Sequence, residues 1–299
     1  MKVLTLGSSS SVDSNHMINL VAHAEGIGEN EELIIGTLYY SGCKLWQHVK
    51  FLQESAPEYR LYLSSTATPD QPPEILKNVT MEQALVYADW DVIVLQPNGG
   101  ETVREETFTD GQLEIIRNYV NEKKTNPNAF FAYHMIGVPA TLPELLSRYP
   151  YSPNPYAENM AKYDYDRKKY YMARTENIRK YVFADGIYRF VVCTGTASMN
   201  ASTSYLGELG TLRDYTHATD VARVIGSYMW YTNLMGIHHL EKIKLDAIPK
   251  AFLKSTVDKT QDRVLTQMEK AIILESVNNA LAHPLEITQS QYTEAPSAS

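Results

Sequence analysis

Four consecutive serines, Ser8 to Ser11, follow a short apolar run that ends at Gly7. A serine hydroxyl becomes a nucleophile when a base takes its proton and a third group orients that base. Far downstream, in LRDYTHATD, Asp214 and His217 are three residues apart just before a helical pattern. This spacing lets the carboxylate reach the imidazole Nδ1 while Nε2 faces outward. The residue types therefore predict a serine, histidine and aspartate system, provided that the fold brings the two segments together.

Each of these features also has a plainer interpretation. Serine is a favoured N-cap, so the serines could cap a helix or hold a phosphate at its N-terminus. Asp214 or Thr216 could cap the helix that follows them, which would leave His217 as a first-turn surface residue. From these residues alone the alternatives stay open.

Further polar residues follow other apolar runs. Gly42 in YYSGCKLWQHV begins a turn and could present its backbone N–H to an anionic oxygen. Asn98 in LQPNGG offers a side-chain amide, although Asn beside glycine usually serves the turn itself. Gln96 is either an extra donor to a ligand or a residue that closes the end of its strand. His134 in YHMIG either contacts substrate or is packed in the interior.

The elements that must position these residues alternate between strands and helices. Five short apolar runs predict buried strands: VLTLG, ELIIGTLYY, DVIVLQP, NAFFAYHMIGV and YRFVVCTG. The segments between them have apolar residues at helical spacing, which predicts a βαβ series. Such a series packs as an open, doubly wound, mostly parallel sheet with helices on both faces. Ligands bind these sheets at the carboxyl ends of the strands, where the serines, Gly42 and Asn98 all lie.

Three segments interrupt this pattern. YRLYLSSTATPDQPPE predicts an edge strand or a surface excursion followed by a proline-rich loop. TLPELLSRYPYSPNPYAENMAKYDYDRKKYY predicts either a tyrosine-rich lid over a pocket or a packed surface helix. IPKAFLK and DKTQDRVLTQMEKAIILESVNNALAH predict helices beyond the last strand. We therefore expect an α/β domain over residues 1–239, a helical extension packed on it over 240–287, and a flexible tail over 288–299.

Composition limits the classes of function. The chain has 299 residues, of which 44% are hydrophobic and 21% charged, as in an ordinary soluble globular protein. Its net charge of -8 offers no basic surface for nucleic acid or for an anionic membrane. No apolar stretch approaches the roughly 20 residues of a membrane span. As written, the sequence predicts a cytoplasmic protein, or a secreted or periplasmic one if a leader has been removed. Its oligomeric state stays open.

Neither the cysteines nor the remaining histidines predict a metal or cofactor site. Cys43 and Cys193 lie in apolar contexts, which favours buried free thiols over a disulfide. The histidines without a carboxylate or cysteine at ligand spacing are His16, His23, His48, His238 and His239. We therefore expect neither a bound metal nor a cofactor.

The order of these blocks resembles the SGNH (GDSL-like) hydrolase superfamily over roughly residues 1 to 235. GSSSSVD, SGCKLWQH and the Asp-x-x-His block are similar to a group of poorly characterised bacterial members whose first block reads close to GNSFS. The resemblance implies a flavodoxin-like, three-layer α/β fold and ester hydrolysis through an acyl-enzyme. It implies that Ser9 is the nucleophile, His217 the general base and Asp214 its orienting partner. The oxyanion hole would then comprise the Ser9 N–H, the Gly42 N–H and the Asn98 side chain.

The chain departs from the family pattern at two blocks. Ser8 stands where the family has Asp or Asn, and Gln96 and Gly99 stand where the third block has Gly and Asp. The hydrogen bonds around the site must therefore differ from those of the family. Four adjacent serines also leave Ser10 as an alternative nucleophile to Ser9. The resemblance implies a small-molecule or carbohydrate ester as substrate, with an acetyl or another small acyl group. The expected rival function is a catalytically silent module that binds a sugar or phosphate.

Overall fold

A seven-stranded, mostly parallel sheet forms the centre of the molecule, in the order β4-β3-β2-β1-β5-β6-β7. The computed structural model describes residues 1–27, 31–253 and 261–296. The strands of this sheet are β1 (Lys2–Gly7), β2 (Ile34–Tyr39), β3 (Tyr59–Ser65), β4 (Glu74–Val79), β5 (Val92–Leu95), β6 (Phe130–His134) and β7 (Tyr188–Val192).

The five predicted strands form the parallel part of the sheet. They run β2-β1-β5-β6-β7, which is the flavodoxin-like order, and the order reverses beside β1. Two further strands, β3 and β4, add to β2 as antiparallel neighbours. The segment that was expected as an edge strand forms β3, which pairs with β4 on its outer side. β4 is largely exposed and forms the actual edge. The α/β class is confirmed, with two more strands than expected.

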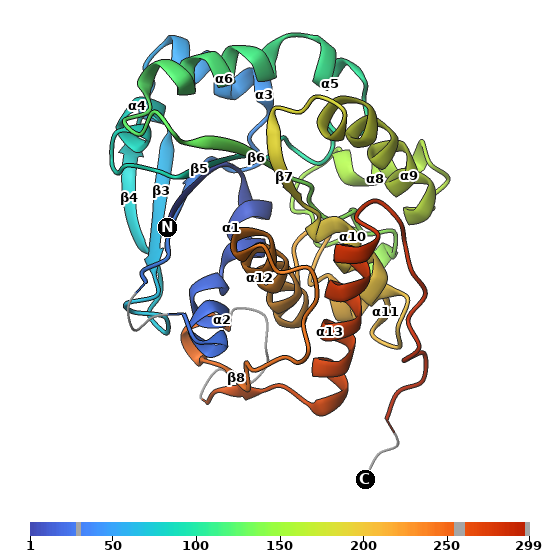
Figure 1. Ribbon diagram of the computed structural model, residues 1–299. Helices are drawn as coiled ribbons and strands as arrows, with labels where there is room; N and C mark the ends of the chain where they lie inside the picture. Colours follow the sequence, from blue (N-terminus) through green and yellow to red (C-terminus); the bar gives the residue numbers. More distant parts are fainter. Residues whose placement is uncertain (28–30, 254–260, 297–299) are drawn as a thin grey trace.

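Helices cover both faces of the sheet (Figure 1). One face is covered by α3, α4 and α6, and the other by α1, α2, α10, α12 and α13. The helices are α1 (Ser9–Asn15), α2 (Ile18–Glu25), α3 (Leu45–Gln53), α4 (Met81–Leu85), α5 (Glu106–Thr109), α6 (Gln112–Lys123), α7 (Pro143–Leu146), α8 (Pro155–Ala161), α9 (Arg167–Ile178), α10 (Thr194–Ser202), α11 (Gly207–Thr211), α12 (Asp220–Met235) and α13 (Gln267–Ala282). A π-helical turn (Arg179–Phe183) extends α9.

The packing of α12 against α1 joins the late part of the chain to the early part. Nearly all of α12 is buried, including Trp230, whose indole N–H donates to Ser14 Oγ at 3.0 Å. Gly226 permits this close approach, because a Cβ at that position would lie 2.9 Å from the backbone oxygen of Ser14. The contact places the residues just before α12 beside the start of α1.

The chain beyond α12 packs on the same face of the sheet. It contains β8 (Ala247–Ile248), a 3-10 turn (Lys250–Phe252), β9 (Arg263–Val264) and α13, which packs on α10 and α12. A helix was expected over IPKAFLK, but the described part of that segment is a short strand and a single turn. Lys254 and the DKT at 258–260 of the second expected segment lie outside the described residues.

The segment expected as a flexible tail over 288–299 contacts the body of the protein in its described part. Residues 288–296 run along α10, where Thr288 N–H donates to Asn200 at 2.8 Å and Tyr205 N–H donates to the Tyr292 carbonyl at 2.8 Å. These long-range bonds join a polar segment, which has no helical or strand pattern of its own, to the end of α10 and the residues after it. Residues 297–299 lie outside the described part.

Within the described residues, we find no helix with the length and apolar character that a membrane crossing needs.

Candidate active site

Ser9 is placed by the change from strand to helix at the carboxyl end of β1. The strand ends at Gly7, Ser8 has an extended backbone, and α1 begins at Ser9. Ser8 occupies the N-cap position but makes no side-chain cap bond, because both its N–H and its hydroxyl donate to Gln96 Oε1. The helix-capping alternative for this serine is therefore not what the structure shows. Ser9, in the first turn, is left half-buried at the edge of the sheet.

The structure brings Ser9, His217 and Asp214 into one hydrogen-bonded chain. His217 Nε2 lies 3.0 Å from Ser9 Oγ, although the two residues are 208 positions apart. On the other side of the ring, His217 Nδ1 lies 2.9 Å from each carboxylate oxygen of Asp214. A nucleophile, a base and an orienting group at hydrogen-bond distance form the arrangement that activates a hydroxyl for acyl transfer.

The segment that carries Asp214 and His217 is a tight loop whose ends pair with each other. Leu212 and Ala218 form an isolated antiparallel bridge, and Arg213 N–H donates to the His217 carbonyl at 2.9 Å. Within the loop, Asp214 Oδ1 accepts from the His217 N–H at 2.9 Å. The cap of α12 is another residue, Thr219, so the alternative of Asp214 or Thr216 as its cap does not apply.

The environment of Asp214 keeps its carboxylate ionised. Burial by itself would raise the pKa of Asp214, but the hydrogen bond and charge of His217, together with the N–H groups of Thr216 and His217, lower it to about 2. An ionised carboxylate can only accept a hydrogen bond, so the proton of the neutral imidazole lies on Nδ1. Nε2 then carries no proton and can accept one. Nε2 is the atom that faces Ser9.

Gly42 and Asn98, the other two predicted oxyanion-hole residues, are joined to each other. Asn98 Nδ2 donates to the Gly42 carbonyl at 3.0 Å, and Asn98 Oδ1 accepts from Gly100 N–H at 2.9 Å. Gly42 has φ +61°, a conformation that favours glycine. Because Gly42 follows β2 and Asn98 follows β5, their bond connects the segments on either side of β1. The structure therefore brings both residues to the edge of the sheet from which Ser9 emerges.

Gln96 lies beneath this edge instead of facing a ligand. Its side chain is 1% exposed, and Oε1 accepts from Ser8 N–H at 2.9 Å and from the hydroxyls of Ser8 and Ser11 at 3.0 Å and 2.9 Å. Its Nε2 donates to the Pro97 carbonyl at 2.6 Å. Gln96 therefore does not take the expected role of a donor to substrate. It takes the alternative role at the end of its strand, where its hydrogen bonds connect β5 to the start of α1.

Replacing Gln96 with Met should lower the free energy of unfolding by about 2–4 kcal/mol, because several buried donors lose their acceptor. Urea unfolding followed by circular dichroism measures the change. Gln83→Met is the matched control: Gln83 accepts one N–H, from Thr80, in an exposed capping box, and its loss should cost less than about 1 kcal/mol. Equal and small losses in the two variants would contradict the role given to Gln96.

His134 is also placed in the interior and does not line the crevice. Its side chain is 1% exposed, with Nε2 2.8 Å from Thr194 Oγ1 and the ring edge-on to Trp230. Burial lowers the pKa of His134 to about 3. The substrate contact expected for this residue is replaced by packing with hydrogen bonds.

A cluster of four tyrosines adjoins His217. Tyr215 is edge-on to the His217 ring at 5.5 Å between centroids and packs on Tyr149 and Tyr156 at 4.9 Å and 4.5 Å. Tyr151, which is 73% exposed, packs edge-on to Tyr149. The four hydroxyls have no hydrogen-bond partner among the described residues. The tyrosine-rich segment was singled out in the sequence, but Tyr215 was overlooked even though it lies between Asp214 and His217.

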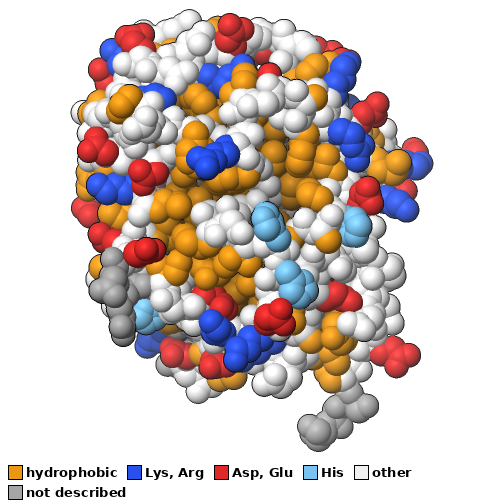
Figure 2. Space-filling view, viewed as in Figure 1, with side chains coloured by type: hydrophobic (Ala, Val, Ile, Leu, Met, Phe, Trp, Pro, Cys, Tyr) orange, Lys and Arg blue, Asp and Glu red, His pale blue; other side chains and the backbone are white. Residues whose placement is uncertain are grey.

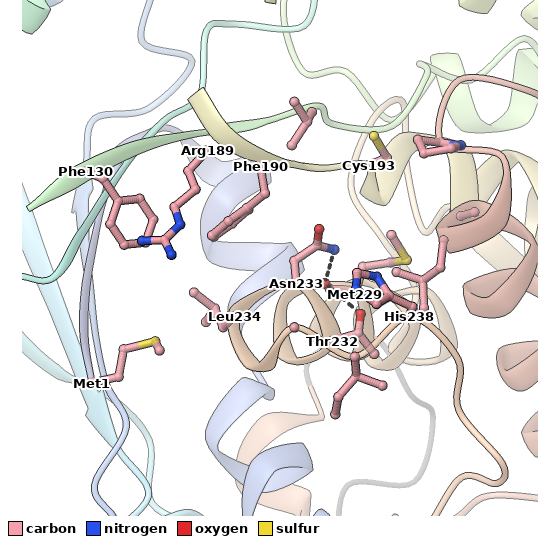
Figure 3. Close-up of a pocket in the computed structure, with 16 residues that line it drawn as sticks. Met1, Phe130, Arg189, Phe190, Cys193, Met229, Thr232, Asn233, Leu234 and His238 are labelled. Carbon is pink, nitrogen blue, oxygen red and sulfur yellow. Dashed lines mark hydrogen bonds between the residues drawn. The ribbon is translucent and has the colours of Figure 1, made fainter. Parts of the chain in front are cut away.

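The larger clefts of the molecule lie away from these residues. One cleft of about 430 Å³ is lined by Phe130, Phe190 and Leu234, among others, between β7, α12 and α13 (Figure 3). Hydrophobic side chains gather on this face of the molecule (Figure 2). No predicted site residue lines this cleft. A hollow of about 50 Å³ is instead lined by Ser10, which follows Ser9, and by Thr216 and Ala218, which flank His217.

The described residues contain no group of three or more His, Cys, Asp or Glu side chains arranged to hold a metal ion. Both cysteines are free and buried, and burial raises the pKa of Cys193 to about 12. Thiol chemistry is therefore not favoured at either position.

Residues 2–251 match the family described as a domain of unknown function, DUF4886. Among solved structures, the chain is similar to a DUF4886 family protein from Bacteroides uniformis ATCC 8492, with 22% identity, a TM-score of 0.75, and coverage of 98% of this chain and 99% of that chain. It is also similar to a proposed SGNH hydrolase from Slackia heliotrinireducens, with 13% identity, a TM-score of 0.46, and coverage of 78% and 98%. No curated protein matches the chain. Since the family match spans most of its residues, the chain belongs to the DUF4886 family.

Proposed function

We propose that the protein is a serine esterase of the SGNH type that works through an acyl-enzyme. The observation that carries this proposal is the hydrogen-bonded chain from Ser9 Oγ through His217 to Asp214, with links of 3.0 Å and 2.9 Å. Fold likeness alone would not support an activity, since one fold hosts many functions. The side-chain geometry supports the proposal because it is the arrangement that nucleophilic catalysis by a hydroxyl requires.

The reaction would proceed in two halves. Ser9 Oγ attacks the ester carbonyl while its proton passes to His217 Nε2, and the tetrahedral intermediate then expels the alcohol, which takes that proton. Water next attacks the acyl-enzyme, with His217 as base, and the carboxylic acid leaves as Ser9 regains its proton. The N–H groups of Ser9 and Gly42 and the amide of Asn98 would stabilise the oxyanion in both halves. Each such donor typically lowers the barrier by about 2.7–4 kcal/mol.

We propose an acetyl or similarly small acyl group on a carbohydrate or related alcohol as the substrate. The hollow of about 50 Å³ beside the chain neighbours of Ser9 and His217 is lined mostly by small side chains, with Ile136 and Leu212 as larger ones, and has room for only a few heavy atoms. Next to His217, the tyrosine cluster offers apolar ring surface together with hydroxyls that have no partner in the described residues. Rings that combine an apolar body with a polar tip suit a polyhydroxylated ring.

The rival function is a silent module that binds a sugar or phosphate in the same crevice. Phosphate binding by the serine segment is disfavoured, because the hydroxyls of Ser8 and Ser11 already donate to Gln96 and are not available to a phosphate oxygen. Ser9 and Ser10 are the two of the four whose hydroxyls are not used in this way. Phosphate capture by the segment would predict phosphate-dependent thermal stabilisation and no covalent labelling.

A fluorophosphonate probe should label the protein once, at Ser9, since it reacts with hydroxyls that a base has activated. Mass spectrometry of the digested protein identifies the labelled serine. Ser9→Ala should abolish labelling and aryl acetate hydrolysis, whereas the matched control Ser10→Ala should retain both. An unlabelled wild type, or equal hydrolysis by wild type and Ser9→Ala, would reject the proposed function.

A further inference from the structure

Asp13 lies on the same face of α1 as Ser9, one helical turn further along. Its carboxylate is buried, with a residue exposure of 7%, and the proposed reaction does not use it. A buried carboxylate needs partners, because an unpaired charge in the interior is costly. Those partners come from the loop that carries His217 and from α12.

Three groups donate to the Asp13 carboxylate. Arg223, on α12, donates to Oδ1 from Nε at 3.1 Å and from Nη2 at 2.8 Å. Arg213 Nη1 lies 3.1 Å from Oδ2, and the Ala218 backbone N–H donates to the same oxygen at 3.1 Å. Asp13 therefore joins α1, the histidine loop and α12 at one point.

The two loop partners are the residues that flank the Asp214 to His217 segment. Arg213 directly precedes Asp214, and Ala218 directly follows His217. The Arg213 guanidinium also donates to the Ala218 carbonyl, which closes the loop a second time. Asp13 thus holds both ends of the loop against the helix that carries Ser9.

We propose that Asp13 is a positioning residue that sets the distance between His217 Nε2 and Ser9 Oγ by anchoring the histidine loop to α1. This inference rests on the proposed function for its kinetic consequences. Ser9 and Asp13 are one turn apart on the same helix, so the distance between the nucleophile and the anchoring carboxylate is set by helix geometry. Positioning of this kind has large effects, since a misplacement of about 1 Å can cost about 100-fold in rate.

The charges around His217 give the proposal a second readout. Asp214 and Tyr215 face the ring from its own loop, Arg213 lies at the base of that loop, and Arg223 and Asp13 approach from α12 and α1. Burial would raise the pKa of Asp13, but Arg223, Arg213 and His217 together lower it, so the carboxylate is ionised. Removing its charge leaves Arg213 without its carboxylate partner and Arg223 with Asp220 as its remaining one, and the added positive charge near the imidazole disfavours the imidazolium.

Asp13→Asn tests the proposal, because it keeps the shape of the side chain and removes its charge. We expect kcat for an aryl acetate to fall about 10- to 100-fold with KM changed less than about 3-fold. In NMR titrations, the pH midpoint of the His217 ring resonances should be lower than in the wild type, because the imidazolium loses the charge of Asp13. The matched control is Asp220→Asn, which removes another buried carboxylate that pairs with Arg223, at 3.7 Å. It should leave kcat and the midpoint close to wild type.

Arg213→Gln is the reciprocal variant, on a side chain that is 23% exposed and so more tolerant of change. It should also lower kcat but move the His217 midpoint upward, because it removes a positive charge. Opposite shifts in the two variants cannot arise from general loosening of the fold. Unchanged midpoints, or equal losses in Asp13→Asn and Asp220→Asn, would overturn the proposal. The titration needs no turnover, so a failure of the proposed function, seen as an unlabelled wild type, is distinguishable from a failure of this inference.

Discussion

Replacing His217 with alanine should lower kcat/KM for an aryl acetate by about 10⁴- to 10⁶-fold, because Ser9 loses the base that accepts its proton. The 3.0 Å contact between Nε2 and Ser9 Oγ is the basis of this expectation. Steady-state kinetics at saturating and subsaturating ester measures the loss. The effect should fall mainly on kcat, since the proton transfer occurs in the transition state and not on binding.

A second variant tests whether Ser9 and His217 act as one unit. The double variant Ser9→Ala with His217→Ala should be no slower than either single variant, because residues of one catalytic unit show strongly non-additive losses. His23→Ala, at an exposed position on α2, is the control and should be as active as wild type. A His217→Ala enzyme that keeps a tenth or more of wild-type activity would contradict the role of the imidazole as base.

Asp214→Asn should reduce kcat by about 10³- to 10⁴-fold while leaving the position of His217 largely unchanged. The carboxylate accepts from Nδ1 at 2.9 Å, so an ionised Asp214 keeps Nε2 free of a proton. An asparagine can present its amide N–H to Nδ1, which favours the tautomer with the proton on Nε2 and blocks transfer from Ser9. A loss of less than tenfold would show that Asp214 does not orient the base.

The lowered pKa of Asp214 also predicts how its contribution depends on pH. Its pKa in the fold, about 2, lies below the ordinary value of 3.8, so its stabilisation is present above about pH 4 and is lost as pH falls toward 2. Urea unfolding at pH 7 and near pH 2 should therefore show a wild-type advantage over Asp214→Asn that shrinks in acid. Above about pH 4, the acid limb of the rate profile should report an imidazole and not this carboxylate. A flat rate profile between about pH 5 and 8 would argue against His217 as the base.

The sequence by itself determined the alternation of strands and helices and the order of the polar blocks at the strand ends. Apolar runs such as DVIVLQP form strands that are buried on both faces of the sheet. Their burial can be predicted from their composition and length, without knowing which strands or helices they contact. The pairing of Asp214 with His217 was also readable, because it depends on a spacing of three residues within one loop.

The tertiary structure alone decided which serine faces the imidazole and which polar residues face inward. Successive residues on a helix point about 100° apart, so Ser9, Ser10 and Ser11 are distinguished only by how α1 packs against a loop more than 200 residues away. Gln96 directly follows β5 and His134 is the last residue of β6, near the same sheet edge as Asn98, yet both are 1% exposed, because inward or outward orientation depends on register within the sheet. Asp13 belongs to no sequence motif. Its positioning role can be inferred only from the fold, in which Arg213, Ala218 and Arg223 all donate to its carboxylate. Local spacing can be read along the chain, whereas contacts across it depend on the packing of whole elements.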